Sequence, residues 1–188
     1  TKLSYFIMGS GSFLRGQYFK GITYLMTQIL FIWYFITSGI YRIAGLKTLG
    51  TVEQGKVFDE ARGIYVYSDG DNSMLFLLFG VLAVLIIIGF LIVYYRNIKT
   101  AYLNQQLLAE GKKIPSLKEE INEYLDSKFH VTILILPTIL TFIFTILPLI
   151  FMILIAFTNF DKNHQPPGNL FTWVGFVNFK NIALKCEK

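Results

Sequence analysis

The chain has 188 residues, of which 54% are hydrophobic and only 15% are charged, whereas a soluble domain usually carries about a quarter charged residues. Its formal charge of +5 comes from 17 basic and 12 acidic side chains. Because the basic residues are scattered between apolar segments, the sequence shows no Arg/Lys cluster of the kind that a nucleic acid's phosphate backbone requires, and we expect no nucleic-acid partner. The single cysteine, Cys186, excludes an internal disulfide and a cysteine-based metal site.

Three stretches, at 21–41, 74–95 and 131–157, contain no Asp, Glu, Lys, Arg or His. A hydrocarbon core about 30 Å thick requires roughly 20 apolar helical residues to cross. In lipid every backbone N–H and C=O must be paired internally, so such runs should be helices. The sequence therefore predicts an all-α, multi-pass fold with three transmembrane helices and the lipid bilayer as its surroundings.

The first 20 residues combine short apolar groups with glycines and with Arg15 and Lys20, a pattern typical of a segment at a membrane surface. No cleavable signal peptide is evident, because the first apolar run is too long for one. Since the sequence begins with Thr1 and ends with polar residues, we expect both ends to be cut from a longer chain.

The first uncharged run contains Gln28, the most polar side chain in any of the three runs. An amide at this depth either lines a transport pathway or makes a hydrogen bond to another helix, typically worth about 1 kcal/mol. The hydrogen bond is the favoured interpretation. Trp33 and Tyr34 lie near the middle of the run, where we expect them to be packing residues.

Residues 42–73 are interpreted as a polar connection in which 57–58 and 64–67 pair as a short hairpin. Asn72 or Ser73 is expected to cap the second transmembrane helix. That helix is nearly pure Leu, Ile, Val and Phe, which is typical of a lipid-facing position, and we expect it to carry no chemistry.

Residues 96–130 are predicted to form two helices on the cytoplasmic side. The first continues the second span beyond Arg96 and ends near Gly111. The second is an amphipathic helix at 116–128, in which Ser116 and Glu119 form a capping box. Its apolar residues share one helical face. They are Leu117, Ile121, Tyr124, Leu125 and Phe129.

The third uncharged run contains two prolines, Pro137 and Pro148, and proline removes a helical hydrogen bond and tends to kink the helix. Thr138, Thr141 and Thr145 repeat at spacings of three and four, so their hydroxyls share a stripe that runs on to Pro148. Such a stripe suits contact with other helices or a polar passage. The equally weighted alternative is bonding of the hydroxyls to the helix's own carbonyls.

The orientation rests on the distribution of basic residues. A cytoplasmic N-terminus places 9 basic residues inside and 8 outside, and the inner ones are denser and lie closer to the membrane boundaries. The first connection carries five acids against four bases, which suits an outer location. We therefore expect the N-terminus in the cytoplasm and the C-terminal end outside.

The segment 156–179 joins the end of a proline-containing helix to the sequence Gly-Phe-Val-Asn-Phe at 175–179. It resembles the start of the core of a binding-protein-dependent sugar ABC-transporter permease of the maltose/maltodextrin (MalF) type. The resemblance covers essentially the whole chain, including residues 16–21. It implies that Trp173, Gly175 and Asn178 belong to a loop that contacts a sugar-binding protein.

The resemblance further implies a bacterial cell-membrane permease, not an enzyme, that imports a malto-oligosaccharide. Its partners would be a second homologous permease, two cytoplasmic ATPase subunits and an extracellular sugar-binding protein. ATP would be used by the partner subunits, and no cofactor is expected in this chain. Residues 1–130 would form an N-terminal extension, and residues 131–188 would hold the first core helix and the start of an outer loop.

The family's ATPase-docking loop, EAA-x-x-x-G, does not occur in this sequence, and we expect it downstream. Two other classes stay open: a small multi-pass anchor or interaction protein, and a channel subunit. A channel would be favoured by a charged or carbonyl-rich filter segment, which the sequence does not show. None of the three runs carries a charge, so no proton relay is indicated.

Overall fold

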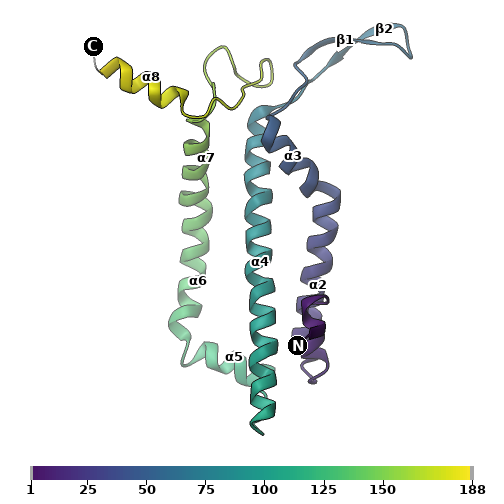
Figure 1. Ribbon diagram of the computed structural model, residues 1–188, viewed down its shortest axis with the longest axis vertical. Helices are drawn as coiled ribbons and strands as arrows, with labels where there is room; N and C mark the ends of the chain where they lie inside the picture. The colour runs from purple at the N-terminus through teal and green to yellow at the C-terminus, as the bar shows by residue number, and fades with distance from the viewer. Residues whose placement is uncertain (1, 187–188) are drawn as a thin grey trace. The chain divides into compact units, whose positions relative to one another are not determined.

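The computed structural model describes residues 2–186 (Figure 1). Three helices are long and apolar enough to span a bilayer, at Tyr18–Thr48, Ser73–Ala109 and Phe129–Ile155. They contain almost all of the three uncharged runs. The prediction of a mainly α-helical, multi-pass membrane protein is therefore confirmed, with one two-stranded hairpin as the sheet in the described residues.

Contacts divide the chain into two units. The first unit consists of Thr1–Ser38 with Leu85–Thr141, and the second of Gly39–Val84 with Phe142–Lys188. Each unit combines segments that are far apart in the sequence. The predicted division of the chain into an N-terminal extension (1–130) and the start of the permease core (131–188) stays a prediction.

In the first unit, the N-terminal residues fold back against the start of α2 (Tyr18–Tyr34). They form a 3-10 helix at Lys2–Tyr5 and a single helical turn, α1 (Ser10–Phe13). Gly9 joins the two with a φ of +82°, and a Cβ at this position would collide with the carbonyl oxygen of Gly21 in α2. The close approach of the segment to α2 therefore requires glycine at position 9.

The helix of the first span does not end at Tyr41, and the prediction of a polar connection from residue 42 was wrong at its start. A π-helical turn at Phe35–Gly39 is followed by α3 (Ile40–Thr48). In the second unit, Gly45 of α3 meets the ring of Phe76. Burial of this side of α3 favours the extra helical turns over a hydrated loop.

The hairpin consists of β1 (Gly55–Asp59) and β2 (Ile64–Ser68), paired antiparallel with Val57 opposite Val66. The carboxylate of Asp59 accepts hydrogen bonds from the N–H groups of Ala61 and Arg62 in the turn, at 3.0 and 3.3 Å. The predicted pairing of 57–58 with 64–67 is confirmed. Most of its side chains are exposed on both faces.

The second span is one continuous helix, α4 (Ser73–Ala109), as Figure 1 shows. The side-chain oxygen of Asn72 accepts from the N–H of Met74 (3.1 Å) and Leu75 (3.2 Å), which confirms Asn72 as the cap. The predicted continuation beyond the span is also confirmed. The chain leaves the helix through Gly111, whose φ is +70°.

The amphipathic helix is α5 (Leu117–Leu125), and its capping box is confirmed. Ser116 Oγ accepts from the Glu119 N–H at 3.3 Å, and Glu119 Oε2 accepts from the Ser116 N–H at 2.7 Å. The helix is shorter than the predicted 116–128. The Lys128 N–H bonds to the carbonyl five residues earlier (2.8 Å), and this wider turn leads into the next helix.

The third span consists of α6 (Phe129–Thr141), a π-helical turn at Phe142–Ile146, and α7 (Leu147–Ile155). Pro137 lies inside α6, whereas Pro148 lies in the first turn of α7. The π-turn lies just before Pro148, which removes a hydrogen-bond donor and crowds the preceding turn. A last helix, α8 (Val177–Cys186), follows the loop after α7.

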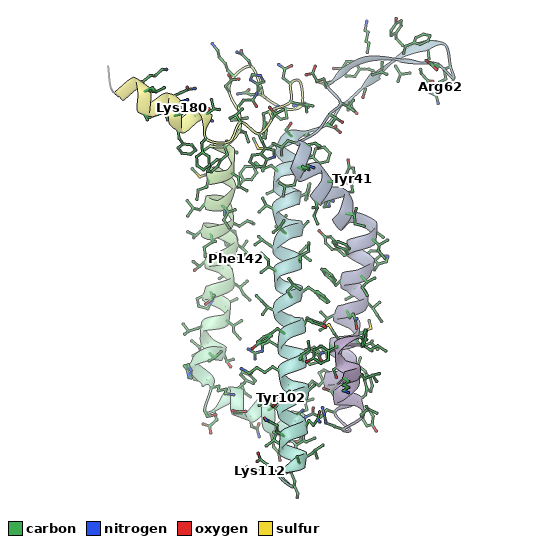
Figure 2. The ribbon with its side chains drawn as sticks, viewed as in Figure 1. Tyr41, Arg62, Tyr102, Lys112, Phe142 and Lys180 are labelled. Carbon is green, nitrogen blue, oxygen red and sulfur yellow. The ribbon has the colours of Figure 1, made fainter. Side chains whose placement is uncertain are left out.

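Side chains project from each span, as the sticks in Figure 2 show, and many of the large apolar ones are exposed. Each span contains a most apolar stretch of 18 residues. Only 11%, 22% and 0% of the residues in these stretches, in chain order, are buried within the protein. Exposed leucine, isoleucine and phenylalanine at this density would aggregate in water. The surfaces therefore require lipid or further protein helices around them.

Candidate functional site

The loop after α7 is fixed to the end of that helix in the second unit. Thr158 and Trp173 form an isolated antiparallel bridge. Asn159 supports it from both sides, because its N–H donates to the Thr172 carbonyl (3.1 Å) and its side-chain oxygen accepts from the Thr172 N–H (2.6 Å). The result is a closed loop whose two ends lie side by side.

The three residues predicted to contact a binding protein, Trp173, Gly175 and Asn178, lie together at the end of this loop. Trp173 Nε1 donates to the Leu46 carbonyl at 2.9 Å, and Asn178 Nδ2 donates to two backbone carbonyls that follow α7, at 2.9 and 2.7 Å. Gly175 supplies a φ of +60°. Two of the three side chains thus hold the loop, and their contact with a partner stays a prediction. Phe176, which is 75% exposed, is the most accessible large side chain of this turn.

A small apolar core lies under the loop in the second unit. Leu49, Leu77 and Phe171 are fully buried, and Trp173 packs against them. The Phe171 N–H donates to the hydroxyl of Ser73 at 3.2 Å, which connects the loop to the first residue of α4. The loop is therefore held to α3 and α4 by burial as well as by hydrogen bonds.

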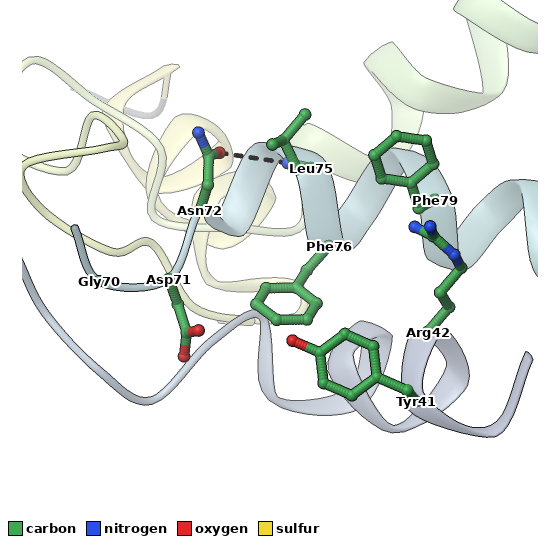
Figure 3. A pocket seen from close by; sticks show the side chains of 8 residues that line it. All are labelled: Tyr41, Arg42, Gly70, Asp71, Asn72, Leu75, Phe76 and Phe79. Atoms are coloured by element: carbon green, nitrogen blue, oxygen red, sulfur yellow. Dashed lines mark hydrogen bonds between the residues drawn. The ribbon is translucent and has the colours of Figure 1, made fainter. Parts of the chain in front are cut away.

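A pocket of about 260 Å³ opens beside this core, between α3 and the start of α4 (Figure 3). Arg42 stacks its guanidinium over Phe79, 4.1 Å from the ring centroid, and Tyr41 packs against Phe76. The Asp71 carboxylate accepts from two backbone N–H groups, at 2.7 and 3.0 Å. These polar groups serve the fold, and the arrangement holds no nucleophile paired with a base.

Gln28 lies in the first unit and contacts the folded-back N-terminal segment. Its side-chain oxygen accepts from the Met8 N–H at 2.8 Å, and its amide nitrogen donates to the Phe6 carbonyl at 2.9 Å. The amide therefore pairs backbone groups that would otherwise be unsatisfied beside the span. A role for Gln28 in a transport pathway stays a prediction.

The hydroxyl stripe of the third span is exposed along α6 and the π-turn that follows it. Within residues 2–186, Thr138, Thr141 and Thr145 make no hydrogen bond through their hydroxyls, whereas the hydroxyls of Thr23 and Thr27 in α2 bond to the carbonyls four residues earlier, at 3.0 and 2.9 Å. The stripe and the exposed Pro148 are thus free to contact other helices. That contact stays a prediction.

The sequence reasoning missed the residues that fix the N-terminal segment to α4. Asn97 is 2% exposed; its side-chain oxygen accepts from the Gly9 N–H (3.1 Å) and its nitrogen donates to the Ser4 carbonyl (3.3 Å). Asn104, seven residues later, is 5% exposed and donates to the Gln17 side chain at 3.1 Å. A signal was present, because these two asparagines share one helical face with an alanine between them.

Asp161 and His164 form an exposed pair in the loop after α7. The Asp161 carboxylate accepts from His164 Nδ1 at 2.8 Å and from the backbone N–H groups of Asn163 and His164. These hydrogen bonds, the one from the His164 side chain first, hold the pKa of Asp161 below its ordinary value. Since the charged form is stabilised, the contacts persist above the ordinary carboxylate pKa and are lost as the pH falls through the lowered pKa.

Replacing His164 with alanine is therefore expected to raise the pKa of Asp161 toward its ordinary value. The measurement is an NMR titration of the labelled aspartate carboxyl carbons in detergent micelles. Lys162→Ala, in the same turn but with a side chain that makes no ion pair with the carboxylate, is the control and should leave the titration unchanged. An identical titration in the wild type and in H164A would show that the histidine does not stabilise the carboxylate.

The described residues 2–186 contain no group of three or more His, Cys, Asp or Glu side chains placed to hold a metal ion. No buried side-chain nitrogen or oxygen in this part of the chain lacks a hydrogen-bond partner. The buried polar groups therefore serve packing and loop fixation. The described residues therefore present an apolar helical surface that can contact a membrane or further helices.

Comparison with known proteins reveals similarity along 94% of the chain. It is 32% identical over 178 residues to the maltodextrin transport system permease protein MalC of Streptococcus pneumoniae. It is 33% identical over 180 residues to the galactooligosaccharides transport system permease protein GanP of Bacillus subtilis, and 29% identical over 177 residues to the maltodextrin transport system permease protein MdxF of that organism. The chain spans 37–38% of the length of these relatives. No protein-family model matches the chain, and no solved structure matches it.

Proposed function

We propose, from this homology to sugar-transport permease proteins along 94% of the chain, that the chain is a membrane-spanning part of a permease subunit in an ATP-driven importer of a malto-oligosaccharide. The observation that carries the proposal is the length of the similarity. It extends through all three apolar helices and the loop that follows them. The exposed surfaces of the spans support it, because a permease fragment needs further helices to cover them.

The proposal includes the partners and the orientation. A second homologous permease would pack in the membrane, two ATPase subunits would bind in the cytoplasm, and an extracellular sugar-binding protein would deliver the sugar. The N-terminus would lie in the cytoplasm, so that the loop with Trp173, Gly175 and Asn178 faces the binding protein. The unpartnered hydroxyls of Thr138, Thr141 and Thr145 would contact helices of the permease core.

A galactooligosaccharide is the second candidate substrate, because the identity to GanP, 33%, equals that to MalC within a percentage point. Both candidates are neutral oligosaccharides, and the described residues offer no feature that separates them. The substrate is decided by uptake measurements.

The test is uptake of radiolabelled maltodextrin by the source bacterium with the gene deleted and restored. We expect uptake to fall to background in the deletion strain and to recover with the gene. A competing excess of unlabelled galactooligosaccharide should leave maltodextrin uptake unchanged, and full competition would favour the second candidate. Uptake of both sugars that is unaffected by the deletion would contradict the proposal.

A further inference from the structure

A groove of about 700 Å³ lies in the first unit, lined by residues of α2, α4 and α5 and by the turn after α5. Its charged lining comes from four basic and two acidic side chains. They are Lys20, Arg96, Lys99, Lys128, Glu120 and Glu123. The groove therefore has an excess of two positive charges at pH 7.

The two acids are already paired. Glu120 accepts from Lys20 Nζ at 2.7 and 2.9 Å, in a pair whose side chains are only 20% and 25% exposed. Glu123 accepts from Lys128 Nζ at 2.7 Å. These two ion pairs neutralise Lys20 and Lys128, so Arg96 and Lys99 are the remaining cations of the groove.

Arg96 and Lys99 lack a carboxylate partner within the described residues. The one hydrogen bond of the Arg96 side chain in these residues goes to the Tyr124 hydroxyl, at 3.5 Å, and none of their ion pairs involves Lys99. Both side chains are exposed and both line the groove. Two cations side by side without a counter-ion favour the binding of an anion.

The groove lies at the level where the apolar spans end. Arg96 is the first charged residue after the uncharged run of α4, and Lys20 immediately precedes the uncharged run of the first span. Tyr24 and Tyr95 also line the groove, and tyrosine at this level is typical of the boundary between lipid and water. A bound anion would therefore lie at headgroup depth, beside exposed apolar helix surface.

The floor of the groove is fixed by hydrogen bonds between segments distant in sequence. Asn104, which lines the groove, donates to Gln17 Oε1 at 3.1 Å, and Gln17 Nε2 donates to the Pro115 carbonyl at 2.8 Å. The Lys20–Glu120 pair joins α2 to α5 on the same side. The cations are thus presented by a preformed surface that needs little ordering upon binding.

We propose that this groove binds the phosphodiester headgroup of an anionic phospholipid, with Arg96 and Lys99 contacting the phosphate and the acyl chains lying along the apolar surface of α4. Basic pockets between transmembrane helices are suited to such headgroups. A lipid is favoured over a soluble anion because apolar surface and unpaired cations meet at this one place. The site depends only on the chain lying in a bilayer and is independent of the transported sugar.

The test uses the purified chain in detergent micelles and fluorescent phosphatidylglycerol, with fluorescent phosphatidylcholine as the reference, because its choline cation balances the phosphate charge and leaves no net charge. We expect phosphatidylglycerol to bind at least about tenfold more tightly, equivalent to about 1.4 kcal/mol. The double variant Arg96→Gln/Lys99→Gln should lose this preference. The matched control Lys113→Gln/Lys118→Gln removes two lysines that also lack an ion pair but lie outside the groove, and it should keep the preference.

Lys99 makes no ion pair within residues 2–186, so the second variant, Lys99→Gln alone, should weaken the preference without changing thermal unfolding. An equal loss in the control double variant would show that net charge alone attracts the lipid, and would overturn the proposal. Displacement of phosphatidylglycerol by an equal concentration of inorganic phosphate would also overturn it, since the site would then recognise a free anion.

Discussion

Gly80→Leu is expected to destabilise the protein by about 1–3 kcal/mol, the usual cost of overpacking a tight contact. A Cβ added at Gly80 in α4 would lie 2.5 Å from the Cβ of Leu46 in α3, which is held close to the backbone and cannot swing away. Gly45→Leu should act in the same direction against the ring of Phe76. The helices pack through these small residues, as is common in membranes.

The control for this prediction lies in the same helix. An added Cβ at Gly89 would meet no atom within 4 Å apart from its own helix backbone and chain neighbours, so Gly89→Leu should be neutral or stabilising, because leucine favours a helix over glycine by up to about 1 kcal/mol. The measurement is thermal unfolding of the detergent-solubilised chain, followed by circular dichroism. Equal midpoints for G80L and G89L would show that α3 and α4 do not pack through Gly80.

Asn97→Leu is expected to release the N-terminal segment from α4. The substitution leaves the Gly9 N–H and the Ser4 carbonyl without their partner, and each buried unpaired group costs about 1–3 kcal/mol. Amide hydrogen exchange of residues 4–13 should therefore become faster, while the exchange of α4 stays slow. The other long-range hydrogen bonds of the segment lie on its N-terminal side, from Tyr94 to the Tyr5 carbonyl (2.9 Å) and between Gln28 and the backbone of Phe6 and Met8.

Asn122→Leu on the exposed face of α5 is the matched control for Asn97→Leu, because it makes the same exchange of side chains without removing a buried hydrogen bond. It should leave exchange of residues 4–13 at the wild-type rate. Unchanged exchange in N97L would mean that Asn97 does not hold the segment.

The main elements of the fold follow from local sequence. Uncharged runs longer than a bilayer crossing predict the spans, because lipid tolerates few charged side chains and no unpaired backbone. The caps at Asn72 and Ser116 are equally local, since each hydroxyl or amide bonds within three residues. The hairpin is predicted by the β-branched and aromatic residues on either side of its turn.

The parts that the sequence reasoning missed depend on contacts between distant residues. The extension of the first span through α3 follows from packing of Gly45 and Leu46 on α4, which no local pattern of 42–48 reveals. The roles of Trp173 and Asn178 in holding the loop depend on backbone carbonyls up to 127 residues away. Local periodicity does not specify such partners. The candidate site is therefore less predictable than the spans.

The central claim is that hydrocarbon surrounds the three apolar helices, and Trp33 tests it most directly. This side chain is 66% exposed near the middle of the first span, and Trp173→Phe makes it the sole tryptophan. In vesicles, lipids brominated deep in their acyl chains should quench Trp33 fluorescence strongly, and aqueous iodide should not. Strong quenching of Trp33 by iodide with none by the brominated lipids would contradict the account.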